Sequence, residues 1–297
     1  MAGVRIGVVL PPFGADAGRE VAAAARHAER RGLDSVWTGD HLVAVRPKLD
    51  ATMVLTAAAA ATERIRVGFG VLVLALRPVA WAAKQVATLQ HLSGGRVVLG
   101  VGVGGDVHGD IGWHAAGVPF AERGPRTDAA LEVLPGLVRG EPTVLDDRKV
   151  TLEPGAPLPP VLVGGGRAAL RRALRFGHGW YPAFTDEAVI ADGARRLAER
   201  AAELDRPAPE VTAGVVAVLG DVPRERIEAE ARSLAGYGMS EDEALRTLLT
   251  GGPAAAADRI TALAAAGATE VVALCRGDDW FHQVELLAET RRLLTTA

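Results

Sequence analysis

A carboxyl group and an imidazole stand side by side in this sequence, at Asp40 and His41, directly after a short apolar run. A histidine in such a position can donate a hydrogen bond to a bound ring or exchange a proton near neutral pH. In the alternative interpretation, Asp40 caps the next helix and His41 is a surface residue. The pair marks a candidate catalytic site, but two residues alone do not specify a reaction.

Two glycine-rich segments can bring the backbone close to a ligand. One consists of Gly164, Gly165, Gly166 and Arg167, between an apolar run and a helical pattern. Backbone N–H groups at a helix start attract anions, so this turn is a candidate phosphate site. The other, Gly100–Gly105, lacks a helix at the spacing that a dinucleotide fingerprint requires, but it can let the backbone approach a flat ligand. Either segment can also serve only as a tight turn or a packing corner.

Eight short apolar runs, each followed by a helical pattern, must position these residues. Their near-regular spacing, without a linker, predicts an α/β fold: a single (β/α)8 TIM barrel over residues 1–297. A doubly wound open sheet shows the same alternation and is the alternative. The irregular stretch Glu141–Pro160 predicts an insertion of short strands between the fourth and fifth barrel strands. The predicted barrel strands are Arg5–Leu10, Ser35–Thr38, Ile65–Leu74, Val97–Val101, Val161–Val163, Trp180–Tyr181, Val211–Leu219 and Glu270–Leu274.

Active sites of such barrels lie on the face where the strands end, which is where the pair and both glycine segments are expected. Gly68 and Gly70 lie inside the third predicted strand, where glycine often marks a bulge or the close approach of a ligand. We expect Asp106–Pro119 to be a loop on the same face.

Composition excludes several classes of function. A formal net charge of −3 gives no electrostatic footprint for nucleic acid or for an anionic membrane. From the sequence we expect no leader segment and no membrane span. The lone Cys275 excludes an internal disulfide and fits a reducing cytoplasm, where we expect the protein to reside. The histidines show no metal-ligand spacing, so we expect no metal and disfavour a metal-dependent hydrolase.

Taken in order, five motifs of the chain resemble the bacterial luciferase-like family of flavin and deazaflavin oxidoreductases. The likeness is strong from the first strand to about Trp180 and looser beyond it. Each motif alone is weak, whereas five in order are specific. The motifs are Leu33–Leu42, Ala61–Gly68, Leu89–Gly104, Val118–Gly124 and Pro160–Trp180.

The resemblance implies a barrel that binds FMN or coenzyme F420 at its mouth, and it implies roles for particular residues. Asp40 and His41 are expected to contact the ring and to take part in catalysis. Gly70 and Val71 are expected to form a non-prolyl cis peptide that supports one face of the ring. The remaining cofactor contacts are expected at Val103, Gly104, Gly164, Gly165, Gly166 and Arg167. A homodimer is expected because dimers are common in the family.

One position departs from the family pattern. The F420-dependent sugar-phosphate dehydrogenases carry a glutamate as proton donor after the fourth-strand glycines, where this chain has Gly105. Sugar-phosphate oxidation is therefore doubtful, and a catalytic acid would have to come from Asp106 or His108. The substrate is expected to be a small organic molecule near the tryptophans Trp37, Trp113 and Trp180, although Trp37 can equally be barrel core.

The motif Thr38–Leu42 resembles the F420-using branch more than the FMN-using one. We therefore favour an F420-dependent oxidoreductase that transfers hydride between the deazaflavin and its substrate. The alternatives are an FMN-dependent monooxygenase, which needs O2 and flavin reduced by a separate reductase, and a catalytically silent flavin-binding relative. In each case the cofactor carries the chemistry, and the protein orients the substrate and excludes water.

Overall fold

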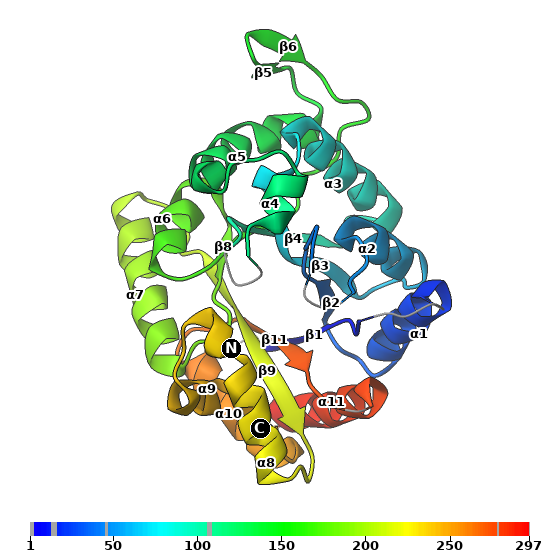
Figure 1. Cartoon of the computed structure of the whole chain (residues 1–297), viewed down its shortest axis with the longest axis vertical. Coiled ribbons are helices and arrows are strands. Elements are labelled where there is room, and N and C mark those ends of the chain that lie inside the picture. Colours follow the sequence, from blue (N-terminus) through cyan, green and yellow to red (C-terminus); the bar gives the residue numbers. More distant parts are fainter. Residues whose placement is uncertain (1–2, 13–16, 45–46, 106–108, 278, 297) are drawn as a thin grey trace.

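The computed structural model describes residues 3–12, 17–44, 47–105, 109–277 and 279–296, and these form a closed parallel barrel (Figure 1). The ring closes where the first strand pairs with the last and where the sixth pairs with the seventh. Closure confirms the predicted (β/α)8 barrel and excludes the open sheet. A further short strand, β10 (Leu249–Gly251), pairs with the end of the seventh barrel strand outside the ring. The barrel strands are β1 (Arg5–Val9), β2 (Ser35–Thr38), β3 (Arg66–Val73), β4 (Val97–Gly102), β7 (Val161–Gly164), β8 (Gly179–Tyr181), β9 (Glu210–Leu219) and β11 (Glu270–Cys275).

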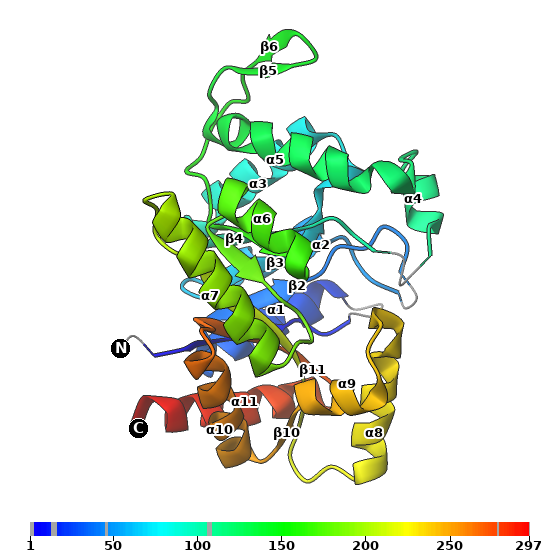
Figure 2. The same ribbon diagram turned by 90° about the vertical axis from the view of Figure 1, so that its left-hand side faces the viewer.

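Helices cover the outside of the ring and flank its mouth. The mouth, where the strands end, faces right in Figure 2, beside α4 (Ile111–Ala115) and the pair α8 (Arg224–Ser233) and α9 (Glu241–Thr247). Short 3-10 turns lie at Leu74–Leu76, Phe120–Glu122 and Ala235–Tyr237. The outer helices are α1 (Ala17–Arg30), α2 (Ala51–Ala60), α3 (Val79–Ser93), α5 (Arg123–Arg139), α6 (Arg167–Phe176), α7 (Glu187–Glu203), α10 (Pro253–Ala265) and α11 (Trp280–Thr296).

The expectation of a continuous loop from Asp106 to Pro119 was wrong, because α4 lies within it. Trp113 of α4 is buried against Val73 and Ala75 at the end of β3. Burial of a large indole stabilises this short helix although its local sequence, with Gly109, Gly112 and Gly117, favours a loop.

The predicted insertion is a hairpin of β5 (Thr143–Leu145) and β6 (Arg148–Val150), which projects from the barrel in both views (Figures 1 and 2). Asp146 and Asp147 turn it with positive φ angles of 45° and 62°, as a tight hairpin turn requires. The returning chain is tied to α3, where Gln90 donates a hydrogen bond to the Pro157 carbonyl at 2.9 Å. The insertion is therefore an appendage whose base is fixed to the barrel.

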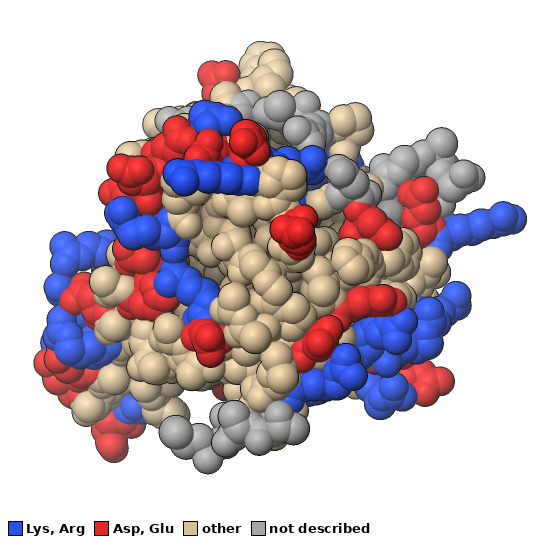
Figure 3. Space-filling model, turned by 90° about the horizontal axis from the view of Figure 1, so that it is seen from below, with Lys and Arg blue, Asp and Glu red and all other residues tan. Residues whose placement is uncertain are grey.

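The charged side chains on the outer surface are of mixed sign. On the face seen in Figure 3, basic and acidic groups lie intermingled around an uncharged centre. Many are helix pairs one turn apart, such as Arg224 with Glu228 at 2.7 Å. Such exposed pairs contribute little to stability, so burial inside the barrel is the more important term.

The barrel interior is filled by one aromatic pair and short aliphatic side chains. Trp37 and Tyr181 pack with their ring centroids 5.5 Å apart, and Trp37 has no exposed surface. Two glycines make room for the indole, because a Cβ on Gly68 would overlap it and one on Gly7 would lie 2.8 Å from its Nε1. The large side chain on β2 therefore requires glycine on both neighbouring strands.

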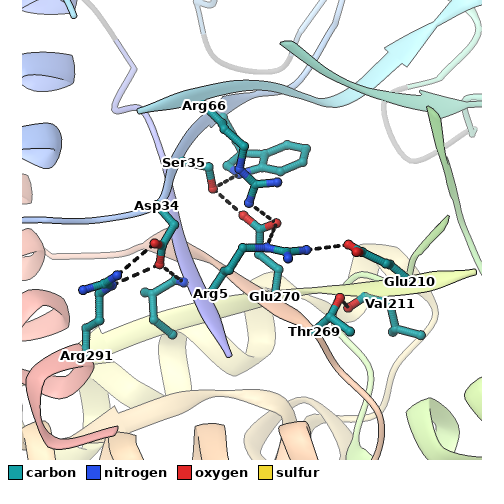
Figure 4. A network of polar contacts seen from close by, with 11 residues as sticks. Arg5, Asp34, Ser35, Arg66, Glu210, Val211, Thr269, Glu270 and Arg291 are labelled. Atoms are coloured by element: carbon teal, nitrogen blue, oxygen red, sulfur yellow. Dashed lines mark hydrogen bonds and ion pairs between the residues drawn. The ribbon is translucent and has the colours of Figure 1, made fainter. Parts of the chain in front are cut away.

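A buried carboxylate closes the end of the barrel where the strands begin (Figure 4). The Glu270 side chain is 1% exposed and accepts hydrogen bonds from Ser35 Oγ at 2.5 Å and from Arg66 Nη2 at 2.7 Å. Arg5 Nε lies 3.5 Å from it, and Ser35 Oγ accepts in turn from Trp37 Nε1 at 2.7 Å. This network links the polar floor of the barrel to its aromatic core. It lies at the N-terminal ends of the strands, the face of such barrels that contributes to stability and not to catalysis.

Replacing Glu270 with Gln is expected to lower the free energy of unfolding by about 3 kcal/mol, because the two arginines lose their buried counter-charge while the volume stays the same. Urea unfolding measures this change. The matched control is Glu210→Gln, which removes a 54% exposed partner of the same Arg5 and should cost less than about 1 kcal/mol. An equal loss of unfolding free energy in the two variants would contradict the role of Glu270 as the buried counter-charge.

A histidine holds the start of β7. The Val161 N–H donates to His178 Nδ1 at 3.1 Å, and the His178 N–H donates to the Val161 carbonyl at 2.7 Å. Accepting at Nδ1 requires that this nitrogen be unprotonated. Desolvation of the ring lowers the pKa of His178, and the nearby Arg139 and Arg206 lower it further.

Stability is therefore expected to fall as the pH drops below the ordinary histidine value of 6.5. The pKa of His178 is lower in the folded protein than in the unfolded chain, so the unfolded chain binds the proton first as the pH falls. The contribution of His178 to stability is therefore complete above pH 6.5 and declines below it. The check is the urea midpoint between pH 7.5 and pH 5. His178→Asn, whose side-chain oxygen can accept the same hydrogen bond without titrating, should flatten the decline. An unchanged slope in that variant would show that His178 is not its source.

Candidate functional site

A bulge in β3 forms one wall of the barrel mouth. Phe69 pairs with Leu99 and Leu72 with Val101, so β3 carries one more residue than β4 between these pairs. Within the bulge, the peptide bond from Gly70 to Val71 is cis, which confirms that part of the prediction. Its role as a support for a cofactor ring stays a prediction.

The Val71 side chain lies across the strands that follow, and glycines receive it. A Cβ on Gly102 would overlap Val71 Cγ2, and one on Gly164 would lie 2.8 Å from Val71 Cγ1. A Cβ on Gly100 would overlap the Phe69 carbonyl oxygen. Gly100 and Gly102, expected to admit a flat ligand, are thus accounted for by the packing alternative. Gly164 is likewise required by Val71, whatever else it does.

Asp40 braces the bulge from the neighbouring strand. Its carboxylate, 3% exposed, accepts hydrogen bonds from the Val73 N–H at 3.0 Å and from Arg77 Nη2 at 2.6 Å. Its own N–H donates to the Val71 carbonyl at 3.1 Å. The observed role of Asp40 is therefore to fix the bulge, and its predicted contact with a ring stays a prediction.

Three groups converge on the backbone of Gly39. A Cβ there would lie 3.1 Å from the Gly70 carbonyl oxygen, 3.3 Å from Lys48 Nζ and 3.6 Å from His41 Cε1. Glycine fits this position because a larger residue would crowd the carbonyl oxygen and the ends of the two side chains. The structure thus brings the predicted His41 to the bulge and adds Lys48.

The candidate phosphate turn lies between β7 and α6. Gly165 has a φ of +122°, which favours glycine, and its carbonyl accepts a hydrogen bond from Trp180 Nε1 at 2.6 Å. Gly166 is the N-cap of α6, with no side chain capping it, and a Cβ there would meet nothing within 4 Å. The Arg167 side chain is 77% exposed, 3.8 Å from Asp192. A cavity of ≈ 380 Å³ beside the turn is lined by Arg167, Leu170, Trp180, Asp186, Ala188, Val189, Asp192 and Gly193.

The three predicted substrate tryptophans do not share a cavity. Trp37 lies inside the barrel, whereas Trp180 lies on the outside of the sheet, where a Cβ on Gly193 of α7 would overlap its ring. Trp113 packs against Gly104, which has a φ of +71°, at the end of β4. Successive side chains of a strand point to opposite faces, so Tyr181 points into the barrel and Trp180 points out of it. A run as short as Trp180–Tyr181 does not show from sequence which of the two faces inward.

The other predicted residues are placed only in part. Val103 and Gly104 are half-buried just beyond β4, beside the bulge. Asp106 and His108, the candidate acids, lie outside the described residues. Among the residues that are described, no three His, Cys, Asp or Glu side chains gather as a metal site requires.

Sequence reasoning missed Lys48, and it assigned no role to Arg77 and Tyr181 of this region. Arg77 and Tyr181 follow or end barrel strands, and that position was the signal available for them. Burial raises the pKa of the Tyr181 hydroxyl, with a further contribution from Glu270, so this group stays neutral. Lys48 stands in an irregular segment, where no pattern indicates that its side chain reaches back to Gly39.

The fit between Val71 and its glycines can be tested by Gly102→Ala. The added methyl group overlaps Val71, so the free energy of unfolding should fall by about 1–3 kcal/mol in urea unfolding. Gly105→Ala is the control, because a Cβ there meets nothing within 4 Å and the change should stay within about 0.5 kcal/mol. In a Val71→Ala background, Gly102→Ala should cost much less. An undiminished cost there would refute the contact.

The sequence matches the model of the luciferase-like monooxygenase family over residues 4–269. An uncharacterised protein of Mycobacterium tuberculosis is 44% identical over 138 residues, 43% of this chain and 46% of that protein. An F420-dependent glucose-6-phosphate dehydrogenase of Amycolatopsis mediterranei is 30% identical over 210 residues, 63% of each chain. The chain thus spans about half of the first relative's length and less than two thirds of the second's.

Solved structures share the fold over nearly the whole chain. An F420-dependent secondary alcohol dehydrogenase in complex with an F420–acetone adduct superposes with a TM-score of 0.82 at 17% identity, covering 97% of this chain and 98% of that one. The oxygenating constituent of 3,6-diketocamphane monooxygenase from Pseudomonas putida, in complex with FMN, gives 0.75 at 17% identity, covering 96% and 97%. No helix among the described residues is long and apolar enough to cross a membrane.

Proposed function

The chain belongs to the luciferase-like monooxygenase family, and on that premise we propose that it is an F420-dependent oxidoreductase acting on a small organic substrate. The observation that carries the proposal is the contact between the bulge and the strand of the glycine turn. Val71, in the cis peptide, packs against Gly164, and the uncapped start of α6 follows two residues later. This contact supports the proposal because a wall for the ring and a site for the phosphate would then lie on one face of the barrel.

The residues at this face fit such a cofactor. Gly166 leaves space where a Cβ would otherwise project, and the N–H groups at the start of α6 favour an anion there. The Gly70 carbonyl and Val71 would support one face of the ring, with Val103 and Gly104 beside it. When bound, the deazaflavin would supply or accept a hydride.

The protein's own residues would orient the substrate and handle protons. His41, close to Gly39 at the bulge, would contact the ring and exchange a proton with the substrate. Asp40 would act mainly through the bulge that it braces, since its carboxylate already has two partners. Arg167 would add a positive charge at the phosphate turn. Asp106 and His108 are retained as candidate acids from sequence alone.

The alternative cofactor is FMN, with O2 as co-substrate and a separate reductase as partner. It is favoured by the likeness of fold to an FMN-containing monooxygenase component. A catalytically silent flavin-binding relative is the third possibility, and replacement of His41 separates it from an active enzyme. The lone Cys275 is half-buried, and desolvation of its thiol raises its pKa to about 12, which is consistent with the cytoplasmic setting that we propose.

We further propose a homodimer formed through α2 and α3. The sequence of α2, Ala51–Ala60, has no charged residue, and α3, Val79–Ser93, has only Lys84 and a histidine. Met53 is 64% exposed and Trp81 67% exposed. An uncharged outer surface on two neighbouring helices supports contact with a second copy, because identical faces without charge meet without repulsion.

Titration of the purified protein with F420 and with FMN, followed by cofactor fluorescence, tests the proposed function. F420 should bind more tightly than FMN, and Gly166→Val should weaken binding at least about tenfold by intruding on the phosphate. Gly252→Val is the matched control, since Gly252 is also an N-cap, that of α10, with nothing within 4 Å of its Cβ position. Binding of neither cofactor would overturn the proposal, and tight FMN binding without F420 binding would favour the monooxygenase.

A further inference from the structure

The ammonium of Lys48 lies at the barrel mouth, although the residue as a whole is exposed. Its Nζ lies 3.3 Å from the Cβ position of Gly39, where the Gly70 carbonyl and the His41 ring also converge. This is the point at which the bulge, the proposed support of the ring, meets β2. A lysine on a surface segment has no structural need to turn its charge toward this wall.

The use of lysine in this chain is selective. Of 33 basic Lys and Arg residues only three are lysines, at positions 48, 84 and 149. Lys84 donates a hydrogen bond to the Glu153 carbonyl at the base of the insertion, and Lys149 is exposed on β6. The ion pairs of Glu270, Asp40 and Asp34 described or drawn above all use arginine. Arginine cannot release a proton at ordinary pH, whereas lysine can.

The surroundings of Lys48 favour release of its proton. Desolvation of the ammonium lowers the pKa of Lys48, the positive charge of Arg276 lowers it further, and the negative charge of Asp40 opposes both. Asp40 is largely engaged by Arg77 and the Val73 N–H, which limits its opposition. His41 lies beside Lys48 at Gly39, and Glu230 lies 3.8 Å from Arg276 and offsets part of the positive charge of that arginine.

We propose that Lys48 exchanges a proton with the substrate in the hydride-transfer reaction, a role that rests on the proposed function. A substrate C=O or C=N group that accepts a hydride with its electron pair, which bound deazaflavin would supply, would lose its π bond and need a proton on an oxygen or nitrogen. An N–H bond of Lys48 breaks, an O–H or N–H bond forms on the substrate, and a neutral amine remains. In the opposite direction, the amine takes the proton back.

This assignment explains how the site can work with Gly105 in place of a glutamate. In place of an acid after β4, the proton would come from a residue that follows β2, on the other side of β3. The competing interpretation is that Lys48 only binds a negatively charged group of the substrate. An arginine would do that equally well, so Lys48→Arg distinguishes the two.

The first test measures the proton directly and needs no cofactor. Reductive ¹³C-methylation labels the lysines, Lys84→Arg and Lys149→Arg assign their signals, and the signals are followed by NMR from pH 6 to pH 11. Lys48 should lose its proton at a lower pH than Lys149, the exposed reference in the same chain. Coincident titration of the two would overturn the proposal.

The second test uses F420H2 with menadione, a quinone whose carbonyl oxygen needs a proton on reduction. Lys48→Arg and Lys48→Met should each lower kcat about 10²–10⁴-fold, while F420 affinity, measured by fluorescence, changes little. Lys149→Arg should behave as wild type. Retained turnover in Lys48→Arg with loss in Lys48→Met would overturn the proposal in favour of anion binding. Failure of the wild-type protein to bind F420 would instead overturn the proposed function on which it rests.

Discussion

The fit of one valine into a row of glycines determines the shape of the barrel mouth. Val71 can lie across β4 and β7 only because positions 102 and 164 carry no side chain, and the bulge that directs it there displaces β3 by one residue against β4. The hydrogen bonds of Asp40 with Arg77 and with the Val73 N–H then hold the bulge in place. The wall beside His41 and Lys48 thus depends on steric complementarity deep in the sheet.

The two ends of the barrel are built on different physical principles. At the floor, Glu270 is buried between two arginines and a serine, so charge is paired and satisfied (Figure 4). At the mouth, Lys48 lies between the positive charge of Arg276 and the negative charge of Asp40, which Arg77 already engages. The carboxylate nearest to Arg276 is that of Glu230, 3.8 Å away, so these three basic side chains share two acidic ones. A satisfied network gives rigidity, whereas an excess of one charge leaves binding capacity. Stability and chemistry are therefore separated along the barrel axis.

Local patterns in the sequence were sufficient to predict the barrel and the insertion, because strands and turns leave signals at short range. The cis peptide was expected only from the family resemblance, since the glycines of β3 by themselves indicate no more than a bulge or the close approach of a ligand. Local patterns were insufficient where a side chain's direction is set by distant packing. Trp37 and Trp180 both end up fully buried, yet one lies inside the sheet and the other outside it. The direction of the Lys48 side chain is set by tertiary contacts near Gly39, which the residues next to Lys48 in sequence do not indicate. Similarly, α4 forms because Trp113 is buried against residues at the end of β3.

The closure of the ring through β1 and β11 has a consequence for the order in which the chain can fold. During synthesis β1 has its partner β2 early, but its other edge waits for residues 270–275, more than 250 positions later. That same strand brings Glu270, the counter-charge of Arg5 and Arg66. Covering the exposed edge and neutralising the floor are therefore a single late event. Until it occurs, the nascent barrel presents an open strand of the kind that chaperones protect from aggregation.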